Sequence, residues 1–257
     1  MDHFFQIRMT GLPPESPMFE AYATLGFLAG ITTRIRLGTL VTSVAYRHPG
    51  VLLKSLTALD VLSGGRTYFG VGVGAAIDPA KLEGIWEAQG LGIPFPSLGR
   101  RFEMLEELLQ IAHRMWEGDE TPFHGKHYDL ARPLNSPNSV QRPRPPILIA
   151  GSGERKTLRL VARYGDACSL FDLPGSFDDV AHKLEVLRAH CTEVGRDFDE
   201  IEKTIASHLD PTSDNFVEHM RELAELGIEH VTLGVNGPWD EKRLAQLAEL
   251  LPEVHAL

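Results

Sequence analysis

The chain has 257 residues, of which 43% are hydrophobic, and its formal net charge is −10 at pH 7. This length and apolar content suffice for one large domain with a buried core. The acidic balance argues against a nucleic-acid partner and against an anionic membrane surface, because both require a basic face. No segment approaches the roughly 18 apolar residues of a membrane span and no signal peptide opens the chain, so we expect a cytoplasmic protein.

The first half of the chain predicts a helix at Pro17–Ala29 and then a β-α-β unit. Two β-rich runs, Ile35–Val41 and Thr67–Val71, bracket a helical run at Pro49–Leu62. A unit of this length predicts parallel strands joined by a right-handed crossover. A long amphipathic helix follows from about Arg100 to Trp116, and then a Pro-rich segment with a hairpin in PFHGKHYDL.

The second half repeats the alternation of strand and helix. The predicted strands are Ile147–Ala150, Ala167–Leu170, Ile201–Ser207 and His230–Val235, and the predicted helices are Glu154–Tyr164, Ser176–Val194, Asp214–Leu226 and Trp239–Leu250. No linker of disordered composition divides the chain, so we expect a single domain over residues 1–257.

Six strands, each beside a helix, indicate either a (β/α)8 barrel with an incomplete front end or an open doubly wound sheet. The barrel is favoured, because no Gly-x-Gly-x-x-Gly opens a helix directly after the first strand. The chain starts at Met1-Asp2-His3 without a preceding strand and helix. Because a closed barrel leaves no unpaired edge, we expect the natural protein to begin about 30–40 residues earlier, one β-α unit.

The two cysteines and the paired histidines do not indicate reactive or metal sites. Cys168 and Cys191 lie in apolar-periodic segments without metal-ligand spacing, which predicts buried free thiols. His124 and His127 lie on the predicted hairpin without acidic ligands in a known pattern. We therefore expect no metal site.

Three loops after predicted strands carry residues that suit a ligand, and each also has a simpler interpretation. Thr39–Ser43 could bulge toward a ligand or could end a core strand in a turn. Gly72-Val73-Gly74 could let a flat ring approach the backbone or could form a tight turn. Gly151-Ser152-Gly153 could bind a phosphate with helix-start N–H groups, or Ser152 could cap the helix. Arg47 and His48 could assist a phosphate or cap the helix at Pro49.

Six segments in order resemble the luciferase-like monooxygenase superfamily, and within it the coenzyme F420-dependent oxidoreductase branch: DHF, GTLVTSVAYRHP, LDVLSGGR, FGVGVG, GIPFPSLGRRFEMLEE and PPILIAGSGERKTLRLVARYGDA. The resemblance implies an α/β fold of the TIM (β/α)8 barrel type, lacking its first strand and helix in this chain. It also implies F420 as the cofactor, with FMN as the alternative, a small-molecule substrate and a homodimer.

The resemblance assigns roles to individual residues. It implies that His3 ends a strand and handles a proton during hydride transfer, a task that suits imidazole. It places a non-prolyl cis peptide near Leu40–Val41 or Val41–Thr42, behind the cofactor ring. The residues that it implies for cofactor binding are Asp2, Leu40, Val41, Thr42, Val73, Gly74, Gly151, Ser152 and Gly153.

The chain departs from the resemblance after Gly74. Similar F420-dependent sugar-phosphate dehydrogenases carry a catalytic carboxylate there, whereas this chain has Ala75 and Ala76. The expected activity is therefore hydride transfer between F420 and a small organic substrate that is not identified. The alternatives are an FMN-dependent luciferase-like monooxygenase and a catalytically silent, truncated paralogue. A barrel hydrolase or aldolase is disfavoured, because no carboxylate pair or lysine stands at a predicted strand end.

Overall fold

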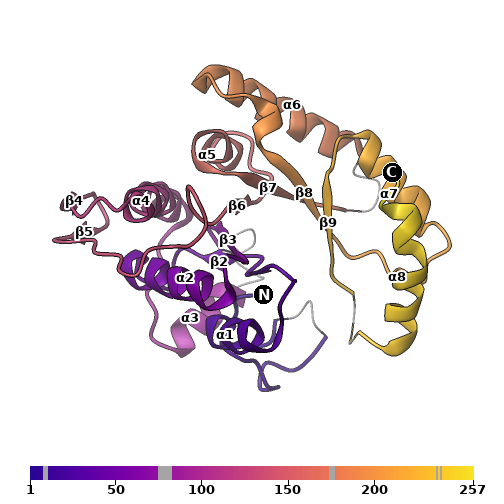
Figure 1. Ribbon diagram of the computed structural model, residues 1–257, viewed down its shortest axis with the longest axis horizontal. Helices are drawn as coiled ribbons and strands as arrows, with labels where there is room; N and C mark the ends of the chain where they lie inside the picture. Colours follow the sequence, from indigo (N-terminus) through magenta and orange to yellow (C-terminus); the bar gives the residue numbers. More distant parts are fainter. Residues whose placement is uncertain (8–10, 75–82, 174–176, 236, 238) are drawn as a thin grey trace. The chain divides into compact units, whose positions relative to one another are not determined.

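The computed structural model describes residues 1–7, 11–74, 83–173, 177–235, 237 and 239–257 (Figure 1). These residues form two compact units, the first comprising most of residues 1–150 and the second most of residues 151–257. The single-domain organisation stays a prediction.

The first unit contains four parallel strands: β1 (Leu37–Gly38), β2 (Thr42–Ser43), β3 (Thr67–Gly72) and β6 (Ile147–Ala150). Both β1 and β2 pair with β3, and β3 pairs with β6 on its other side. The strand predicted over Ile35–Val41 is thus two short strands, separated by the segment between Gly38 and Thr42. The parallel pairing that the β-α-β pattern predicted is confirmed.

Four helices belong to the first unit: α1 (Ala21–Ile31), α2 (Pro49–Ser63), α3 (Glu83–Gly90) and α4 (Leu98–Glu117). Helix α2 begins where Pro49 has its favoured first position, and His48 caps it by accepting a hydrogen bond from Gly50 N at 3.3 Å. It ends at Gly64, whose φ of 69° is the left-handed conformation that glycine adopts readily. Helices α1 and α2 lie side by side (Figure 1), and α4 packs on α2.

Arg66, in the LSGGR segment, links the end of α1 to the segment before β1. Arg66 donates hydrogen bonds to the carbonyl oxygens of Ala29, Thr32 and Ile35, at 2.8–3.0 Å, and to that of Ser63 at 2.8 Å. One guanidinium therefore satisfies carbonyl groups at the end of α1 and before β1 that would otherwise lack partners.

The predicted hairpin is present as β4 (Phe123–His124) and β5 (Asp129–Leu130), which pair antiparallel. Glu107 of α4 holds the turn, because its carboxylate accepts hydrogen bonds from the backbone N–H groups of residues 126–128. The two hairpin histidines pair with carboxylates, His124 with Asp129 and His127 with Glu103.

The second unit contains three parallel strands, β7 (Ala167–Phe171), β8 (Glu202–Ser207) and β9 (His230–Leu233), with β8 paired to both neighbours. Its helices are α5 (Thr157–Tyr164), α6 (Phe177–Val194), α7 (Phe216–Glu225) and α8 (Glu241–Val254), with a short 3-10 helix, η3 (Phe198–Glu200). The prediction started α5 at Glu154, three residues too early. Residues 154–156 form a turn, and the helix starts at Thr157.

Two sequence predictions are wrong in the first unit. Residues 1–7 form no strand, so His3 does not end one; side-chain hydrogen bonds hold this segment, as described below. Helix α3 was not predicted, because its eight residues follow a segment without clear periodicity. Ser176, the predicted N-cap of α6, and Ala75 and Ala76 lie outside the described residues.

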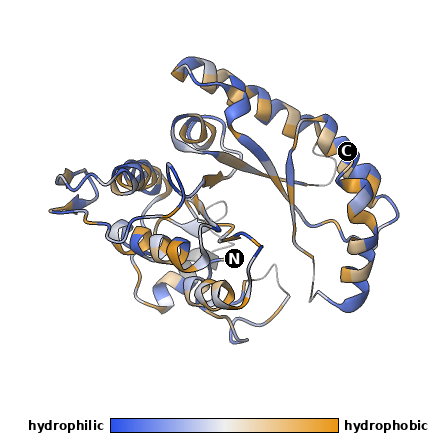
Figure 2. Ribbon diagram, viewed as in Figure 1, coloured by the Kyte–Doolittle hydropathy of each residue, from blue (hydrophilic) through white to orange (hydrophobic). Residues whose placement is uncertain are grey.

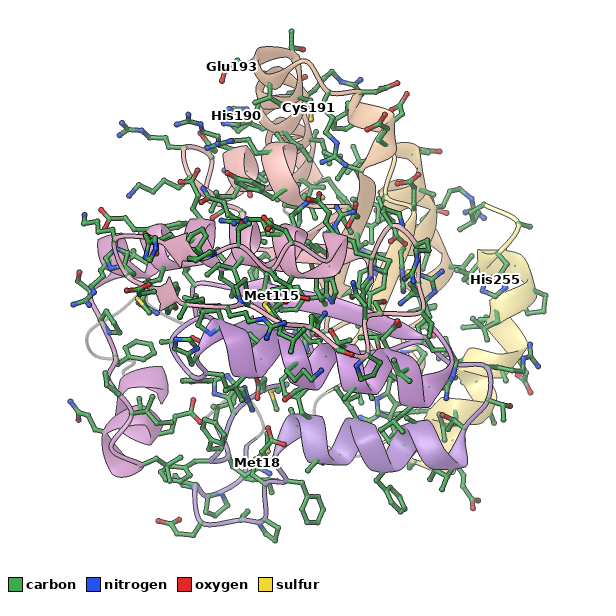
Figure 3. All side chains as sticks on the ribbon, turned by 60° about the vertical axis from the view of Figure 1, so that its left-hand side comes forward. Met18, Met115, His190, Cys191, Glu193 and His255 are labelled. Atoms are coloured by element: carbon green, nitrogen blue, oxygen red, sulfur yellow. The ribbon has the colours of Figure 1, made fainter. Side chains whose placement is uncertain are left out.

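Apolar residues occur along α1 and α2 (Figure 2), and the apolar side chains of β6 and β7 are largely buried. The predicted stripe of α4 is largely buried, with Leu105, Leu109 and Trp116 in the core. Cys168 and Cys191 are free and buried, as predicted; Cys191 lies beside His190 on α6 (Figure 3). None of the helices in the described ranges combines the length and apolar character that crossing a membrane requires.

Candidate active site

The carboxyl ends of β1, β2 and β3 carry most of the residues that the sequence singled out in the first unit. A cis peptide bond joins Leu40 and Val41, the first of the two expected positions. Thr42 is fully buried, whereas Leu40 and Val41 stay partly exposed. Apolar, partly exposed residues at strand ends suit the face of a planar ligand.

A chain of hydroxyl groups supports this turn from inside. Thr39 donates to the carbonyl oxygen of Gly70 at 3.1 Å, and its Oγ1 lies 2.9 Å from Oγ1 of Thr42. Since the Thr39 proton is used, Thr42 donates to Thr39 and accepts from the Tyr22 hydroxyl at 2.7 Å. Burial raises the pKa of Tyr22 to about 12, so its hydroxyl stays a donor at neutral pH. The Thr42 hydroxyl therefore makes its hydrogen bonds to protein groups in the interior.

Gly74 lies two residues beyond β3 with a φ of 78°, the left-handed conformation that glycine adopts readily. A Cβ here would overlap the hydroxyl of Ser43 and would lie 3.3 Å from Nη1 of Arg101. Arg101, at the start of α4, donates to the carbonyl oxygens of Val73 and Gly74 at 2.6 and 3.3 Å. Close packing within the protein accounts for the glycine, and the cofactor-binding roles of Val73 and Gly74 stay predictions.

Asp2 belongs to a buried ion-pair cluster. Its carboxylate oxygens accept two hydrogen bonds from Arg47, at 2.5 and 2.9 Å, and Glu20 also accepts from Arg47. Asp2 is 1% exposed. Burial lowers the pKa of Arg47, but hydrogen bonds to Asp2 and Glu20 outweigh it and raise that pKa above its ordinary value. These contacts give Asp2 a role in anchoring the segment, and the single positive charge of Arg47 is shared by two carboxylates.

His3 lies in a second cluster, with Glu87 of α3 and Tyr46. Nδ1 of His3 is 2.6 Å from Oε1 of Glu87, and the Tyr46 hydroxyl donates to the same oxygen. Oε2 of Glu87 accepts from the backbone N–H groups of Phe4 and Phe5, at 2.7 and 3.3 Å. The Glu87 side chain is 1% exposed and that of His3 is 20% exposed. Only the imidazole of this cluster therefore faces solvent.

The electrostatics of this cluster keep the Glu87 carboxylate charged. Burial opposes ionisation, but hydrogen bonds from His3 and Tyr46 outweigh it and hold the pKa of Glu87 below its ordinary value. Burial and the hydrogen bond to Glu87 raise the pKa of Tyr46 well above its ordinary value. Burial lowers the pKa of the Arg101 guanidinium. Tyr46 is thus a neutral donor, and Glu87 an ionised acceptor, at neutral pH.

The Tyr46 ring lies beside the imidazole and belongs to a small aromatic group. The Tyr46 ring contacts those of His3, Phe4 and Phe95, with centroids 6.3, 5.2 and 6.4 Å away. Arg101 lies over the Phe95 ring at 4.3 Å. These contacts hold the Tyr46 ring, whose edge-on contact restricts the rotation of His3.

The predicted phosphate loop, Gly151–Gly153, lies in the second unit. Gly151 has a φ of 122° and donates its N–H to the Ser169 carbonyl oxygen at 3.0 Å. A Cβ at Gly153 would lie 2.8 Å from Oγ1 of Thr157, the first residue of α5. Ser152 does not cap α5, because Lys156 occupies that position. The phosphate-binding role of the loop stays a prediction.

Sequence reasoning missed Glu87, Tyr46 and Arg101. Glu87 and His3 are 84 residues apart, and no local pattern links them. Tyr46 and Arg101 did stand inside two segments that carry the resemblance, GTLVTSVAYRHP and GIPFPSLGRRFEMLEE. A polar aromatic residue and a doubled arginine in such segments were the available signals.

Comparisons with known proteins point to one family. Residues 2–250 match the model of the luciferase-like monooxygenase family. An F420-dependent glucose-6-phosphate dehydrogenase of Nakamurella multipartita is 28% identical over 229 residues, which cover 86% of this chain and 63% of that protein. An uncharacterized protein of Mycobacterium tuberculosis is 29% identical over 216 residues, covering 84% of this chain and 69% of that protein.

A solved structure gives the fold. An F420-dependent secondary alcohol dehydrogenase, in complex with an F420-acetone adduct, superposes with a TM-score of 0.77 over 93% of this chain and 86% of that chain, at 19% identity. This likeness confirms the predicted α/β fold of the luciferase-like TIM-barrel type. With nearly its whole length matching the family model, the chain belongs to the luciferase-like monooxygenase family.

Proposed function

We propose that this protein transfers a hydride between coenzyme F420 and a small organic substrate. One observation carries the proposal: a partly exposed histidine, held by a buried carboxylate, stands in the same unit as the partly exposed apolar residues that follow β1 and β3. The F420 dependence of relatives at about 28% identity supports the choice of cofactor.

The residues present fit a planar cofactor. Leu40, Val41 and Val73 offer partly exposed apolar surface at the strand ends, and we propose that they hold the ring together with the backbone of Gly74. The loop at Gly151–Gly153 would hold the phosphate, as the resemblance implies. When bound, a deazaflavin supplies the hydride acceptor or donor.

His3 supplies the proton chemistry. As an alcohol is oxidised, its C–H bond loses a hydride and its O–H bond loses a proton; a carbonyl forms, and the imidazole accepts that proton. In the opposite direction the imidazolium returns the proton to the new alkoxide oxygen. The Tyr46 ring covers one side of the imidazole, whose side chain stays 20% exposed.

The charges of the cluster favour a substrate without a phosphate group. The guanidinium of Arg47 already pairs with the carboxylates of Asp2 and Glu20. Glu87 adds an ionised carboxylate beside His3, which repels an anion. We therefore propose an uncharged alcohol or carbonyl compound as the substrate.

Anaerobic mixing with oxidised F420 tests the proposal. We expect reduction of the cofactor with a panel of secondary alcohols and little reduction with glucose 6-phosphate. His3→Gln should lower kcat by about 10²–10⁴-fold and should leave the affinity for F420, measured by fluorescence, within about threefold. Failure to bind F420 rejects the proposal. Binding without turnover on any alcohol or carbonyl compound would favour a silent paralogue instead.

A further inference from the structure

Glu87 divides its two oxygens between different tasks. Oε2 accepts the backbone N–H groups of Phe4 and Phe5, which ties down the segment around His3. Oε1 accepts only side chains, Nδ1 of His3 at 2.6 Å and the hydroxyl of Tyr46. Anchoring of the backbone accounts for the contacts of Oε2. It does not account for the contact of Oε1 with an imidazole.

The charge of Glu87 decides which atom carries the shared proton. An ionised carboxylate has no proton to donate, so the hydrogen between Oε1 and Nδ1 belongs to the imidazole. In neutral His3 this leaves Nε2 without a proton and with a free lone pair.

We propose that Glu87 is a positioning residue that fixes His3 in the Nδ1–H tautomer and so makes Nε2 the proton-exchanging atom. The inference rests on the proposed function for its catalytic meaning, but it concerns the protein alone. A carboxylate in this place also stabilises the imidazolium that forms when Nε2 accepts a proton.

Tyr46 completes the arrangement. Its hydroxyl takes the remaining acceptor direction of Oε1, so the carboxylate cannot rotate away from His3 without losing a buried hydrogen bond. Its ring contacts the imidazole edge-on, with the planes at 71°. The carboxylate and the ring together fix the orientation of His3 as well as its tautomer.

The test is the ¹⁵N spectrum of histidine-labelled full chain without cofactor, above neutral pH. The His3 resonances are assigned by their loss in His3→Gln. We expect the wild type to show a protonated Nδ1 and an unprotonated Nε2, and Tyr46→Phe to keep that pattern. Glu87→Gln should shift His3 toward a mixture of both tautomers. Glu185→Gln, an exposed position on α6, is the matched control and should leave the His3 signals unchanged.

Kinetics give the second measurement. Glu87→Gln should lower kcat by about 10–100-fold, as loss of such a partner does at metal-bound histidines, with KM and F420 affinity little changed. An Nε2–H tautomer in the wild type overturns the inference, even if Glu87→Gln does not fold. An unchanged tautomer in a folded Glu87→Gln protein also overturns it. If F420 does not bind, the proposed function fails while the tautomer still decides this inference.

Discussion

Two buried carboxylates, Asp2 and Glu87, hold the segment that carries His3. Asp2 meets the guanidinium of Arg47, and Glu87 meets two backbone N–H groups, a phenol and an imidazole. Both carboxylates are 1% exposed, so loss of a partner would leave a buried polar group without its hydrogen bond. The position of the proposed catalytic residue therefore depends on polar contacts more than on apolar packing.

The stability of the protein should depend on the charge of Glu87. Its folded-state pKa lies below the ordinary value of 4.5. The stabilisation is therefore present above about pH 4.5 and is lost as pH falls through the lower, folded value. We expect Glu87→Gln to lower the free energy of unfolding by about 1–3 kcal/mol at pH 7, with a smaller difference at pH 3.

Urea unfolding of both proteins at the two pH values measures this. The control is Glu185→Gln, whose side chain is exposed on α6 and should cost less than about 0.5 kcal/mol at either pH. A Glu87→Gln difference that does not change between pH 7 and pH 3 would contradict the charged state assigned to Glu87.

Breaking the Asp2–Arg47 pair from one side should be costly. Arg47→Met leaves the Asp2 carboxylate buried without its cation, so we expect the unfolding free energy to fall by about 3–5 kcal/mol. Adding Asp2→Asn removes the stranded charge and should restore a large part of that loss. Chemical unfolding of the single and double variants checks both values. A double variant no more stable than Arg47→Met would show that Asp2 does not depend on Arg47.

At the level of single residues, the sequence pointed to His3, Asp2 and the strand-end loops. It could not supply their partners. The contacts of His3 with Glu87 and of Asp2 with Arg47 join residues 84 and 45 positions apart, and local patterns carry no information on such pairs. The buried state of Asp2 likewise depends on Arg47, which the sequence only offered as a phosphate ligand or helix cap.

In strand β3, a neighbouring backbone segment approaches so closely that no side chain fits at Gly70. A Cβ at Gly70 would overlap the carbonyl oxygen of Thr39, the residue before the β1–β2 turn. Gly30, exposed in α1, has nothing within 4 Å of the same position. Substitution by alanine should therefore change the stability of the protein in opposite directions at these two glycines.

Gly70→Ala should destabilise the protein by about 1–3 kcal/mol or more, because the strand pair must move apart. Gly30→Ala should stabilise it by about 0.5–1 kcal/mol through helix propensity. Thermal unfolding monitored by circular dichroism measures both as shifts of Tm in opposite directions. Equal shifts for the two variants would contradict the close approach of Gly70 to Thr39.

The elements themselves were mostly predictable. A short apolar run located β6 to the residue, and the helical run predicted at Pro49–Leu62 located α2 within one residue. The predictions failed where tertiary contacts override local preference. Residues 1–7 are held by side chains without forming a strand, the first strand is divided at Leu40–Val41, and α5 starts after a turn that glycines shape.

At the scale of the whole molecule, the predicted homodimer stays a proposal, and α1 offers a surface for it. The helix and its approach expose Phe19, Phe27 and Ile31 at 79%, 67% and 63%. Exposed apolar patches of this kind often mark protein interfaces. In sedimentation experiments we expect the wild-type chain to be a dimer and the Phe27→Glu/Ile31→Glu variant to be a monomer.

Leu244→Glu, an exposed apolar position on α8, is the control and should leave the dimer intact. A wild-type monomer at micromolar concentration, or a dimer that persists in the α1 variant, would contradict this surface.

The central claim is that this chain binds a deazaflavin at the end of its strands, and equilibrium titration with F420 and with FMN tests it most directly. Intrinsic tryptophan and cofactor fluorescence are followed in parallel on the same protein. We predict saturable, micromolar or tighter binding of F420, at least about tenfold tighter than that of FMN, which is about 1.4 kcal/mol. Tighter binding of FMN, or no saturable binding of either compound, would contradict the account.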